Sequence, residues 1–480
     1  MLALIFAAAI THGIAIGDVR SDRAIVWSRA SEAGAMVVEL DTSAGLDRPR
    51  TFSARASADT DFTAQVTLDA LTPDTRYVYR VSFNGSDSAE GTFRTPPAAG
   101  DTVPVRFVVM GDLGGHGYCR EAGVNYAVFS EIETLEPHFL VANGDMIYAD
   151  SACDAERSEG GRNVPGDFPA ITDPEVDWLD AAAVREVFLA HWRYNRADPH
   201  FQRLLSKTPM YSQWDDHEVI NDFGAPWTTL NAWGERGGYP VLVQEGRRAL
   251  FDFHPIERHP EEPYRIYRSF RWGQDAELFL LDARSYRSEN ELADDPDKGK
   301  TLLGAAQLSW LKKGLEDSTA TWKIVSTDVP LSIPTGSNAH LVGRDAFANG
   351  AAQDYSARTG FERELEDLLR HLDAADIDNV VFVATDVHFA TSLRYDVDVD
   401  GDGDTLLFHE LISGPLSAAK LSVQTPDPTF APTILFAEGN LFNFSFVSIE
   451  RIDGISHLIA DIRDDSGTVR FGSRVDLIAR

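Results

Sequence analysis

The order of apolar and polar positions divides the chain into two parts. Beyond Val105, short apolar runs that predict buried strands alternate with stretches in which apolar residues recur at helical spacing. Such alternation is typical of a layered α/β domain. The stretches with helical spacing predict helices over Val124–Leu135, Ala181–Tyr194, Ala305–Glu316 and Phe361–Ala375.

Residues 13–95 have the pattern of an all-β unit. A turn over residues 71–76 leads into an aromatic strand at Tyr77, which resembles the corner of a fibronectin type III or immunoglobulin-like sandwich. Residues 95–104 have the composition of a linker. We predict a small β-sandwich domain over residues 1–97, a linker over 98–104 and an α/β domain over 105–480. The strands expected in the sandwich include Ala24–Ser28, Ala35–Leu40 and Phe62–Leu68.

Several apolar runs of the second part stop abruptly at an acidic residue. In open α/β sheets the carboxyl ends of the strands form the crevice in which ligands bind, so these positions suit chemistry better than packing. Five such segments predict a shared acidic centre, and a cluster of carboxylates needs cations to offset its charge. The acidic residues are Asp112, Asp145, the pair Asp215 and Asp216, Asp328, and Asp386.

Composition and charge restrict the partners of the chain. With 480 residues, 43% of them hydrophobic, the chain can bury a large core. The net charge of -32 argues against nucleic acid or an anionic membrane surface as a partner. The same charge repels a small anionic substrate unless bound metal ions offset it locally. No apolar run approaches the roughly 20 residues that span a bilayer, and we expect a monomer.

The apolar start of the sequence and the two cysteines indicate the cellular compartment of the protein. Leu2–Ile10 is apolar and reads either as the end of a signal peptide or as a buried first strand. Cys119 and Cys153 each follow a strand-end carboxylate by seven or eight residues, so both belong to loops leaving one edge of the sheet. We expect a disulfide and a secreted or periplasmic protein, with two unpaired thiols as the alternative. Residues 151–177 predict a long polar loop over the site.

Four sequence blocks together resemble a known family. They are GDLG at 111–114, GDMIYAD at 144–150, WDDHEVIN at 214–221 and TDVH at 385–388. Their order, and the DDHEV segment above all, resemble the calcineurin-like metallophosphoesterases, and PhoD-like alkaline phosphatases and phosphodiesterases in particular. Many PhoD-like sequences have Cys near the first block, whereas Gly-Asp112 is similar to purple acid phosphatases. The resemblance implies an α-β-β-α catalytic domain.

The resemblance also implies a site for two metal ions. Asp112, Asp145, Tyr148 and His388 would hold the first metal, and Asp145 would bridge to the second. Tyr148 as a phenolate favours Fe³⁺, whereas an all-carboxylate second site suits Ca²⁺, with Mn²⁺ or Mg²⁺ as alternatives. The second site would be completed by Asp216, Asp386 and Asp328, with Asp215 as the alternative to Asp216.

Two further residues have implied roles in catalysis. His217 stands where the superfamily places a histidine that contacts the leaving-group oxygen, and its alternative is a structural histidine paired with a carboxylate. Arg284 is a candidate clamp for phosphate, because a guanidinium can engage two phosphate oxygens, and its alternative is an ion-pair network. The predicted reaction is hydrolysis of a small phosphate ester by in-line attack of a metal-activated hydroxide. These residues do not separate monoester from diester substrates.

A function from another class is a calcium-dependent binding or adhesion protein without catalysis. The acidic run Asp396–Asp404 begins like the calcium loop of an EF-hand, but its twelfth position is Leu407 instead of the bidentate Glu. We expect a tight acidic hairpin there. The adhesion hypothesis leaves the carboxylates and histidines at the strand ends without a purpose, so we favour the metal-dependent phosphate ester hydrolase.

Overall fold

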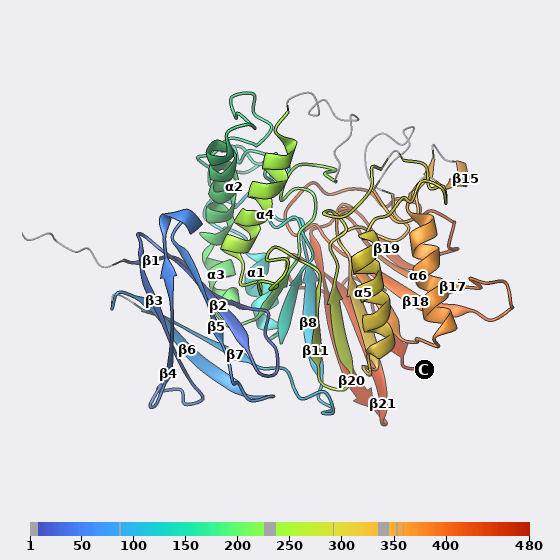
Figure 1. Ribbon diagram of the computed structural model, residues 1–480, viewed down its shortest axis with the longest axis horizontal. Coiled ribbons are helices and arrows are strands. Elements are labelled where there is room, and N and C mark those ends of the chain that lie inside the picture. The colour runs from blue at the N-terminus through green and yellow to red at the C-terminus, as the bar shows by residue number, and fades with distance from the viewer. Residues whose placement is uncertain are drawn as a thin grey trace, which may run out of the picture.

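Two β-sheets lie face to face in the middle of the protein, and helices cover their outer faces (Figure 1). The computed structural model describes residues 8–85, 88–224, 237–290, 292–334, 345–351, 354–358 and 360–480. Side chains from both sheets, including Phe107, Val141, Leu280 and Val383, form one apolar cluster between them. This arrangement confirms the predicted layered α-β-β-α domain.

The nine-stranded sheet combines strands from both ends and the middle of the chain. Its neighbours β8, β9 and β10 are parallel, so their carboxyl ends lie at one edge. The strand order is β22 (Val475–Ile478), β21 (Ile455–Asp464), β20 (Asn443–Ile452), β8 (Val105–Met110), β9 (Phe139–Ala142), β10 (Met210–Ser212), β1 (Ile10–Gly17), β2 (Ala24–Ala30) and β5 (Thr63–Leu68).

The seven-stranded sheet comes mostly from the second half of the chain. Its inner strands β12, β13, β16 and β18 are parallel, which again places several carboxyl ends at one edge. The order is β11 (Arg268–Trp272), β12 (Ala276–Leu280), β13 (Trp322–Ser326), β16 (Val380–Ala384), β18 (Leu406–Ile412), β17 (Ala390–Val397) and β19 (Thr433–Glu438), and a separate ribbon pairs β14 (Gly350–Ala351) with β15 (Asp354–Arg358).

Helices pack on the two outer faces through separate apolar clusters. The first cluster joins the nine-stranded sheet to α1 (Val128–Thr134), α2 (Ala181–Arg196), α3 (Pro199–Leu205) and α4 (Tyr239–Phe253). The second joins the seven-stranded sheet to α5 (Gly304–Asp317) and α6 (Glu362–Ala374). The predicted helices correspond to α1, α2, α5 and α6.

Local sequence explains where two of these helices begin. The side chain of Asp180 accepts hydrogen bonds from the amides of Ala182 and Ala183, which caps α2. Asp198 caps α3 in the same way, and Pro199 occupies the first turn, where a missing N–H costs nothing. The helix α3, with seven residues, was not predicted.

The N-terminal region forms the predicted β-sandwich. A four-stranded sheet of β4 (Arg50–Ala56), β3 (Gly34–Asp41), β6 (Arg76–Phe83) and β7 (Ser88–Arg94) faces strands β1, β2 and β5 across an apolar cluster. One short 3-10 helix, η1 (Ala58–Thr60), precedes β5. The sandwich joins the central sheet where Gly17 of β1 pairs with Met210 of β10.

The sequence left two segments open, the apolar N-terminal stretch and the acidic run near residue 400. Most of Leu2–Ile10 lies outside the described residues, although Ile10 begins β1. The acidic run Asp396–Asp404 joins the antiparallel strands β17 and β18, as the predicted hairpin requires. Within the described part of the chain, no helix is both long and apolar enough to cross a membrane.

The predicted disulfide is present. Cys119 and Cys153 are bonded and lie 34 positions apart in the sequence. Around the bond, the loop over residues 151–177 is tied to residues 116–122: Asn163 Nδ2 donates to Gly117 O at 3.2 Å, and Val164 N donates to Arg120 O at 2.7 Å. The two loops therefore form one cross-linked surface.

The disulfide should stabilise the protein mainly by restricting the unfolded chain. Replacing both cysteines, Cys119→Ser with Cys153→Ser, should lower the free energy of unfolding by about 3–4 kcal/mol, as expected for a loop of this length. Urea unfolding measures the change. Reductant should reproduce it in the native chain and leave the double variant unchanged. Equal midpoints for the native chain with and without reductant would contradict this role.

Candidate metal centre

All the predicted site residues meet at the carboxyl ends of strands from both central sheets. Asp112 follows β8, Asp145 follows β9 and Asp216 follows β10, all in the nine-stranded sheet. Asp328 follows β13 and Asp386 follows β16 in the facing sheet. The centre therefore spans the gap between the ends of the two sheets.

The side chains form two overlapping clusters. Ligand atoms of Asp112, Asp145 and His388 lie within 4.8 Å of one another, as do those of Asp215, Asp216 and Asp386. A third group of Asp145, Asp216 and His217 connects them at the same spacing. Asp145 and Asp216 consequently occupy the middle of the centre, which is the geometry that a bridging carboxylate requires.

The backbone at these positions is strained. Asp112, Asp145, Asp386 and His388 have positive φ values of 58°, 52°, 72° and 57°, in the left-handed region that side-chain-bearing residues rarely adopt. Each such residue costs on the order of 1 kcal/mol or more, and strain of this kind concentrates at functional sites. The turns direct the carboxylates and the imidazole into the centre.

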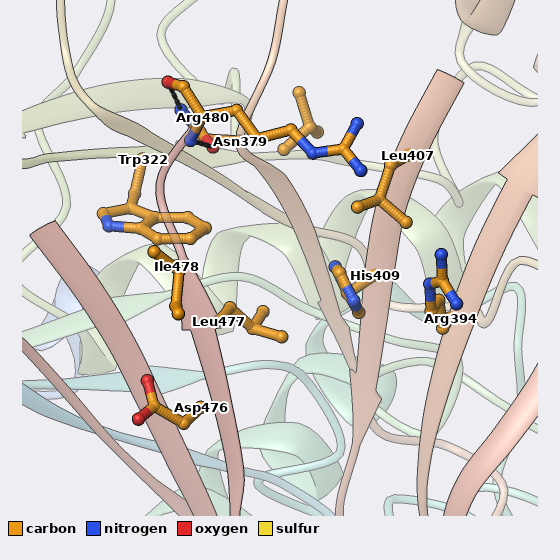
Figure 2. A pocket seen from close by; sticks show the side chains of 10 residues that line it. Trp322, Asn379, Arg394, Leu407, His409, Asp476, Leu477, Ile478 and Arg480 are labelled. Atoms are coloured by element: carbon orange, nitrogen blue, oxygen red, sulfur yellow. Dashed lines mark hydrogen bonds between the residues drawn. The ribbon is translucent and has the colours of Figure 1, made fainter. Parts of the chain in front are cut away.

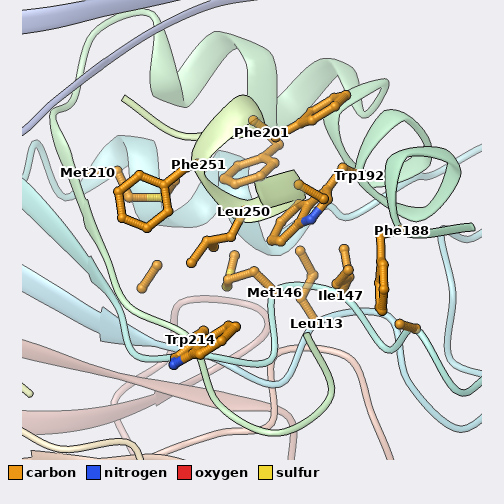
Figure 3. Close-up of a cluster of buried hydrophobic side chains, with 14 of the residues drawn as sticks. Leu113, Met146, Ile147, Phe188, Trp192, Phe201, Met210, Trp214, Leu250 and Phe251 are labelled. Atoms are coloured by element: carbon orange, nitrogen blue, oxygen red, sulfur yellow. The ribbon is translucent and has the colours of Figure 1, made fainter. Parts of the chain in front are cut away.

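Apolar residues next to the acidic ones hold these turns in place. Leu113 follows Asp112, Met146 and Ile147 follow Asp145, and Trp214 precedes the Asp215–Asp216 pair. All four apolar side chains are buried in the cluster beneath α2 and α4 (Figure 3). Shifting a turn would pull one of them out of the core, so packing offsets the backbone strain.

Glu218 fixes the same turns through hydrogen bonds. Its buried carboxylate accepts from the amides of Asp145, Met146 and Asp215 at 2.7–2.9 Å. Burial raises the pKa of Glu218 to about 7, although these donors oppose the shift. Glu218 was not among the predicted site residues, but it belongs to the DDHEV segment that carries much of the resemblance.

Buried carboxylate oxygens without protein partners show that the centre suits cations. Unpaired buried polar atoms are rare because each costs free energy, and a bound ion is one explanation. Gly414 also leaves room for a carboxylate, since a Cβ there would lie 2.0 Å from Asp112 Oδ2. Within the centre, the described carboxylate oxygens without a hydrogen-bond donor are Asp112 Oδ2, Asp215 Oδ2, Asp216 Oδ1, Asp328 Oδ2 and Asp386 Oδ2.

Electrostatics support the same conclusion. Burial raises the pKa of Asp112 to about 8 and that of Asp328 to about 7. Burial and neighbouring carboxylates hold the pKa values of Asp145 and Asp386 well above the ordinary range. Buried carboxylates this close together need protons or cations, and metal ions compete with the protons. The residues present therefore fit a pair of metal ions.

His388 has the tautomer of a metal ligand. Its Nδ1–H donates to Ala419 O at 2.5 Å, which leaves Nε2 as the unprotonated atom, 2.8 Å from Tyr148 Oη. A backbone carbonyl on the far nitrogen is the usual way in which a ligating imidazole is oriented. Burial, followed by the nearby His116, lowers the pKa of His388 to about 3, so the ring is neutral.

His217 lies in a contrasting environment. Its Nδ1–H donates to Asp150 Oδ1 at 2.7 Å, and its amide donates to Asp145 Oδ1 at 3.0 Å. Although burial opposes protonation, the carboxylates of Asp150 and Asp216 raise the pKa of His217 to about 9. In the metal-free centre, the imidazole is therefore protonated at neutral pH. Asp150 ends the sequence block 144–150 and was not among the predicted site residues.

Arg284 takes part in an ion-pair network inside the acidic centre. Its side chain is fully buried; Nε donates to Asp215 Oδ1 at 2.6 Å, and Nη1 donates to Asp345 Oδ2. This network is the alternative that the sequence left open, and contact with phosphate stays a prediction. Because Arg284 engages Asp215, the neighbouring Asp216 is the carboxylate that faces Asp145.

Asp222, Asp345 and Asp328 surround the carboxylates described so far. Asp222 and Asp345 form a group with Asp216 within 4.8 Å, and neither was singled out from the sequence. Asp328 lies at the margin: its Oδ1 accepts from Ala283 N at 3.0 Å, and its Oδ2 is 3.7 Å from Arg284 Nε. The carboxylates of the hairpin at Asp398 also cluster, but they are exposed.

A cavity of about 240 Å³ lies away from this centre, where β13 and β16 begin. Figure 2 shows the side chains that line it. Trp322, Leu407 and His409 line it together with Arg480. The one carboxylate in its lining, Asp476, accepts from His457 Nδ1 at 2.8 Å. The lining therefore offers no cluster of metal ligands, in contrast to the strand-end centre.

Comparison with known proteins identifies the family. Residues 108–440 match the PhoD-like phosphatases, and residues 5–97 match the N-terminal domain of PhoD-like phosphatases. The chain belongs to the PhoD-like phosphatase family. It is therefore a phosphoric ester hydrolase. This result favours the enzyme over the hypothesis of an adhesion protein without catalysis.

Individual relatives agree with this PhoD-like assignment. Alkaline phosphatase D of Bacillus subtilis (strain 168) is 23% identical over 439 residues, which is 85% of this chain and 69% of the relative. A solved structure of PhoD has a TM-score of 0.77 at 18% identity and covers 100% of this chain and 94% of that one. Purple acid phosphatase PPD1 of yellow lupin (Lupinus luteus) has a TM-score of 0.59 at 14% identity, over 98% and 74% of the two chains.

The raised carboxylate pKa values predict how the PhoD-like protein responds to pH without metal. Its folded state binds protons that the unfolded chain releases near pH 4, so stability should fall as pH rises through about 7–8. Metal ions reverse this trend, because they bind the ionised carboxylates. Thermal unfolding at about pH 5 and about pH 9, after chelation and after reloading, measures both trends. Parallel trends would contradict a metal-binding acidic centre.

Proposed function

We propose that this PhoD-like phosphatase hydrolyses small phosphate esters at a dinuclear metal centre. Asp112, Asp145, Tyr148 and His388 hold the first ion, and Asp145 also contacts the second. The buried carboxylate oxygens without protein partners are the observation that carries this proposal. The second ion is held by Asp216 and Asp386, with Asp328 at the margin of the site.

The donor sets suit different ions. Burial and Asp145 hold the pKa of Tyr148 far above its ordinary value, so its phenolate form needs a strongly charged cation. This requirement favours Fe³⁺ at the first position. Carboxylate oxygens at the second position suit Ca²⁺, with Mn²⁺ or Mg²⁺ as alternatives. Two bound cations would activate water and neutralise charge on the phosphoryl group. They would also offset the negative charge locally, whereas the chain's net charge of -32 otherwise repels an anionic substrate.

His217 supplies the proton for the leaving group. Asp150 orients its ring through Nδ1, so Nε2 is the atom available to the departing oxygen. A protonated imidazole held beside a carboxylate is suited to general-acid catalysis. No residue needs to form a covalent bond to phosphorus. The disulfide further supports a protein that matures in an oxidising compartment, outside the cell or in the periplasm.

The proposed ligand sets predict different metal losses. Asp145→Asn should empty both positions, because this carboxylate faces both clusters, whereas Tyr148→Phe should remove the visible tyrosinate-to-Fe³⁺ absorption and leave the second ion. Elemental analysis and absorption spectra measure these outcomes. Absorption that survives in Tyr148→Phe would contradict the first ligand set, and two retained ions in Asp145→Asn would contradict the bridge.

The role of His217 predicts a dependence on the leaving group. His217→Asn should reduce kcat for an alkyl phosphate by about 10²–10⁴-fold, since alkoxide needs a proton, and should affect p-nitrophenyl phosphate far less. Steady-state assays of both esters measure the effect. The same assays include bis-p-nitrophenyl phosphate and a sample treated with chelator. His457→Asn, at the opposite end of the sheet, is the matched control. Equal losses for both leaving groups would contradict a proton donor.

A further inference from the structure

His116 lies at the mouth of the metal centre, outside every role assigned above. It is exposed, yet its ring contacts three residues of the centre in edge-to-face geometry. The ring centroids are 5.1 Å from Tyr148, 5.6 Å from His388 and 5.7 Å from His217. A group bound beside these three residues therefore lies next to the His116 imidazole.

The ring nitrogens of His116 are available to a ligand. His217 is oriented by Asp150 and His388 by Ala419, each through Nδ1. No described residue donates to or accepts from either nitrogen of His116. An imidazole always carries at least one N–H, so His116 presents an unused donor to the mouth of the site whether or not it is protonated.

Backbone hydrogen bonds hold His116 in place, and the nitrogens of its ring take no part in them. The amides of Gly114 and Gly115 donate to Ser417 O at 2.6 and 3.0 Å, and Ser158 Oγ donates to His116 O at 2.8 Å. Gly115 packs so closely that a Cβ there would lie 2.5 Å from the Tyr148 ring. His116 itself has a φ of 55°, a strained conformation that positions its side chain over the site.

An anionic substrate needs hydrogen-bond donors at this mouth. The centre is lined by carboxylates, and its buried guanidinium, Arg284, already engages Asp215 and Asp345. His217 is required at the leaving-group oxygen. The non-bridging phosphoryl oxygens therefore lack a side-chain donor among the residues assigned so far, and His116 is placed to provide one.

We propose that His116 is a substrate-contacting residue that donates a hydrogen bond to a non-bridging phosphoryl oxygen. This inference rests on the proposed function. A monoester dianion places more negative charge on its non-bridging oxygens than a diester, and hydrogen bonds to charged acceptors are the stronger ones. His116 therefore favours phosphate monoesters over diesters.

The test compares His116→Ala and His116→Gln with the native chain. In His116→Ala, KM for p-nitrophenyl phosphate should rise about tenfold, the effect of one hydrogen bond to a charged group. Values of kcat for the monoester, and of kcat/KM for bis-p-nitrophenyl phosphate, should change by less than about threefold, because His217 remains. His116→Gln, which retains an N–H donor, should recover part of the monoester KM.

Binding of inorganic phosphate gives a readout that does not depend on turnover. Calorimetric titration of the metal-loaded proteins should show about tenfold weaker phosphate binding in His116→Ala. Metal content and unfolding temperature should match the native chain, since His116 provides neither a metal ligand nor core packing. The half-buried residue His457, which lies at the opposite end of the sheet and is replaced by Ala, is the control and should leave metal content and phosphate affinity unchanged.

The outcomes separate this inference from the proposed function. A native chain that holds two metals but hydrolyses neither ester overturns the proposed function. An active native chain whose KM and phosphate affinity are unchanged in His116→Ala overturns the role of His116 alone. Loss of metal from His116→Ala, or an equal loss of monoester and diester turnover, also overturns it in favour of a structural role.

Discussion

Mutual repulsion among buried carboxylates is the constraint on which the site depends. Seven aspartates cluster between the ends of two sheets, Asp328 lies beside them, and the described guanidinium groups among them are those of Arg284 and Arg287. Burial, with the nearby carboxylates of Asp216 and Glu218, raises the pKa of Asp112 to about 8. The fold therefore brings together charges that are stable only with protons or metal ions, and at neutral pH metal ions are the stronger stabiliser.

The architecture tolerates this repulsion because the rest of each turn is anchored. Asp112 and Asp145 have strained, left-handed backbones, but Leu113 and Met146 bury their side chains immediately afterwards in the core beneath the helices. Glu218 ties the turns of Asp145 and Asp215 together through their amides. Core packing and buried hydrogen bonds thus stabilise a ligand geometry that the acidic residues disfavour by themselves.

Much of this could be predicted from sequence because strand ends are visible in the apolar pattern. An apolar run that stops at an acidic residue identifies both the strand and the edge to which the residue belongs, which is why Asp112, Asp145 and Asp386 were found. The helix α4 was missed because Gly246 and β-branched residues interrupt its pattern, and tertiary packing overrides their weak helix propensity.

Orientation was the part that sequence could not supply. Arg284 follows a buried strand, as a phosphate clamp would, but whether a guanidinium faces the open site or its acidic floor depends on neighbours more than 50 positions away. The same applies to Asp150, which orients His217 across 67 positions. His116 carries no pattern of its own, because its place over the site follows from the packing of Gly115 on Tyr148.

Three imidazoles within one centre illustrate how environment assigns chemistry. His388, buried and bound to a backbone carbonyl, has a pKa of about 3 and presents a lone pair, as a metal ligand must. His217, beside two carboxylates, has a pKa of about 9 and presents a proton. Groups of one residue type whose environments push their pKa values apart take opposite roles in acid–base chemistry. His116, bound to neither a carboxylate nor a carbonyl through its ring, remains free to recognise the substrate.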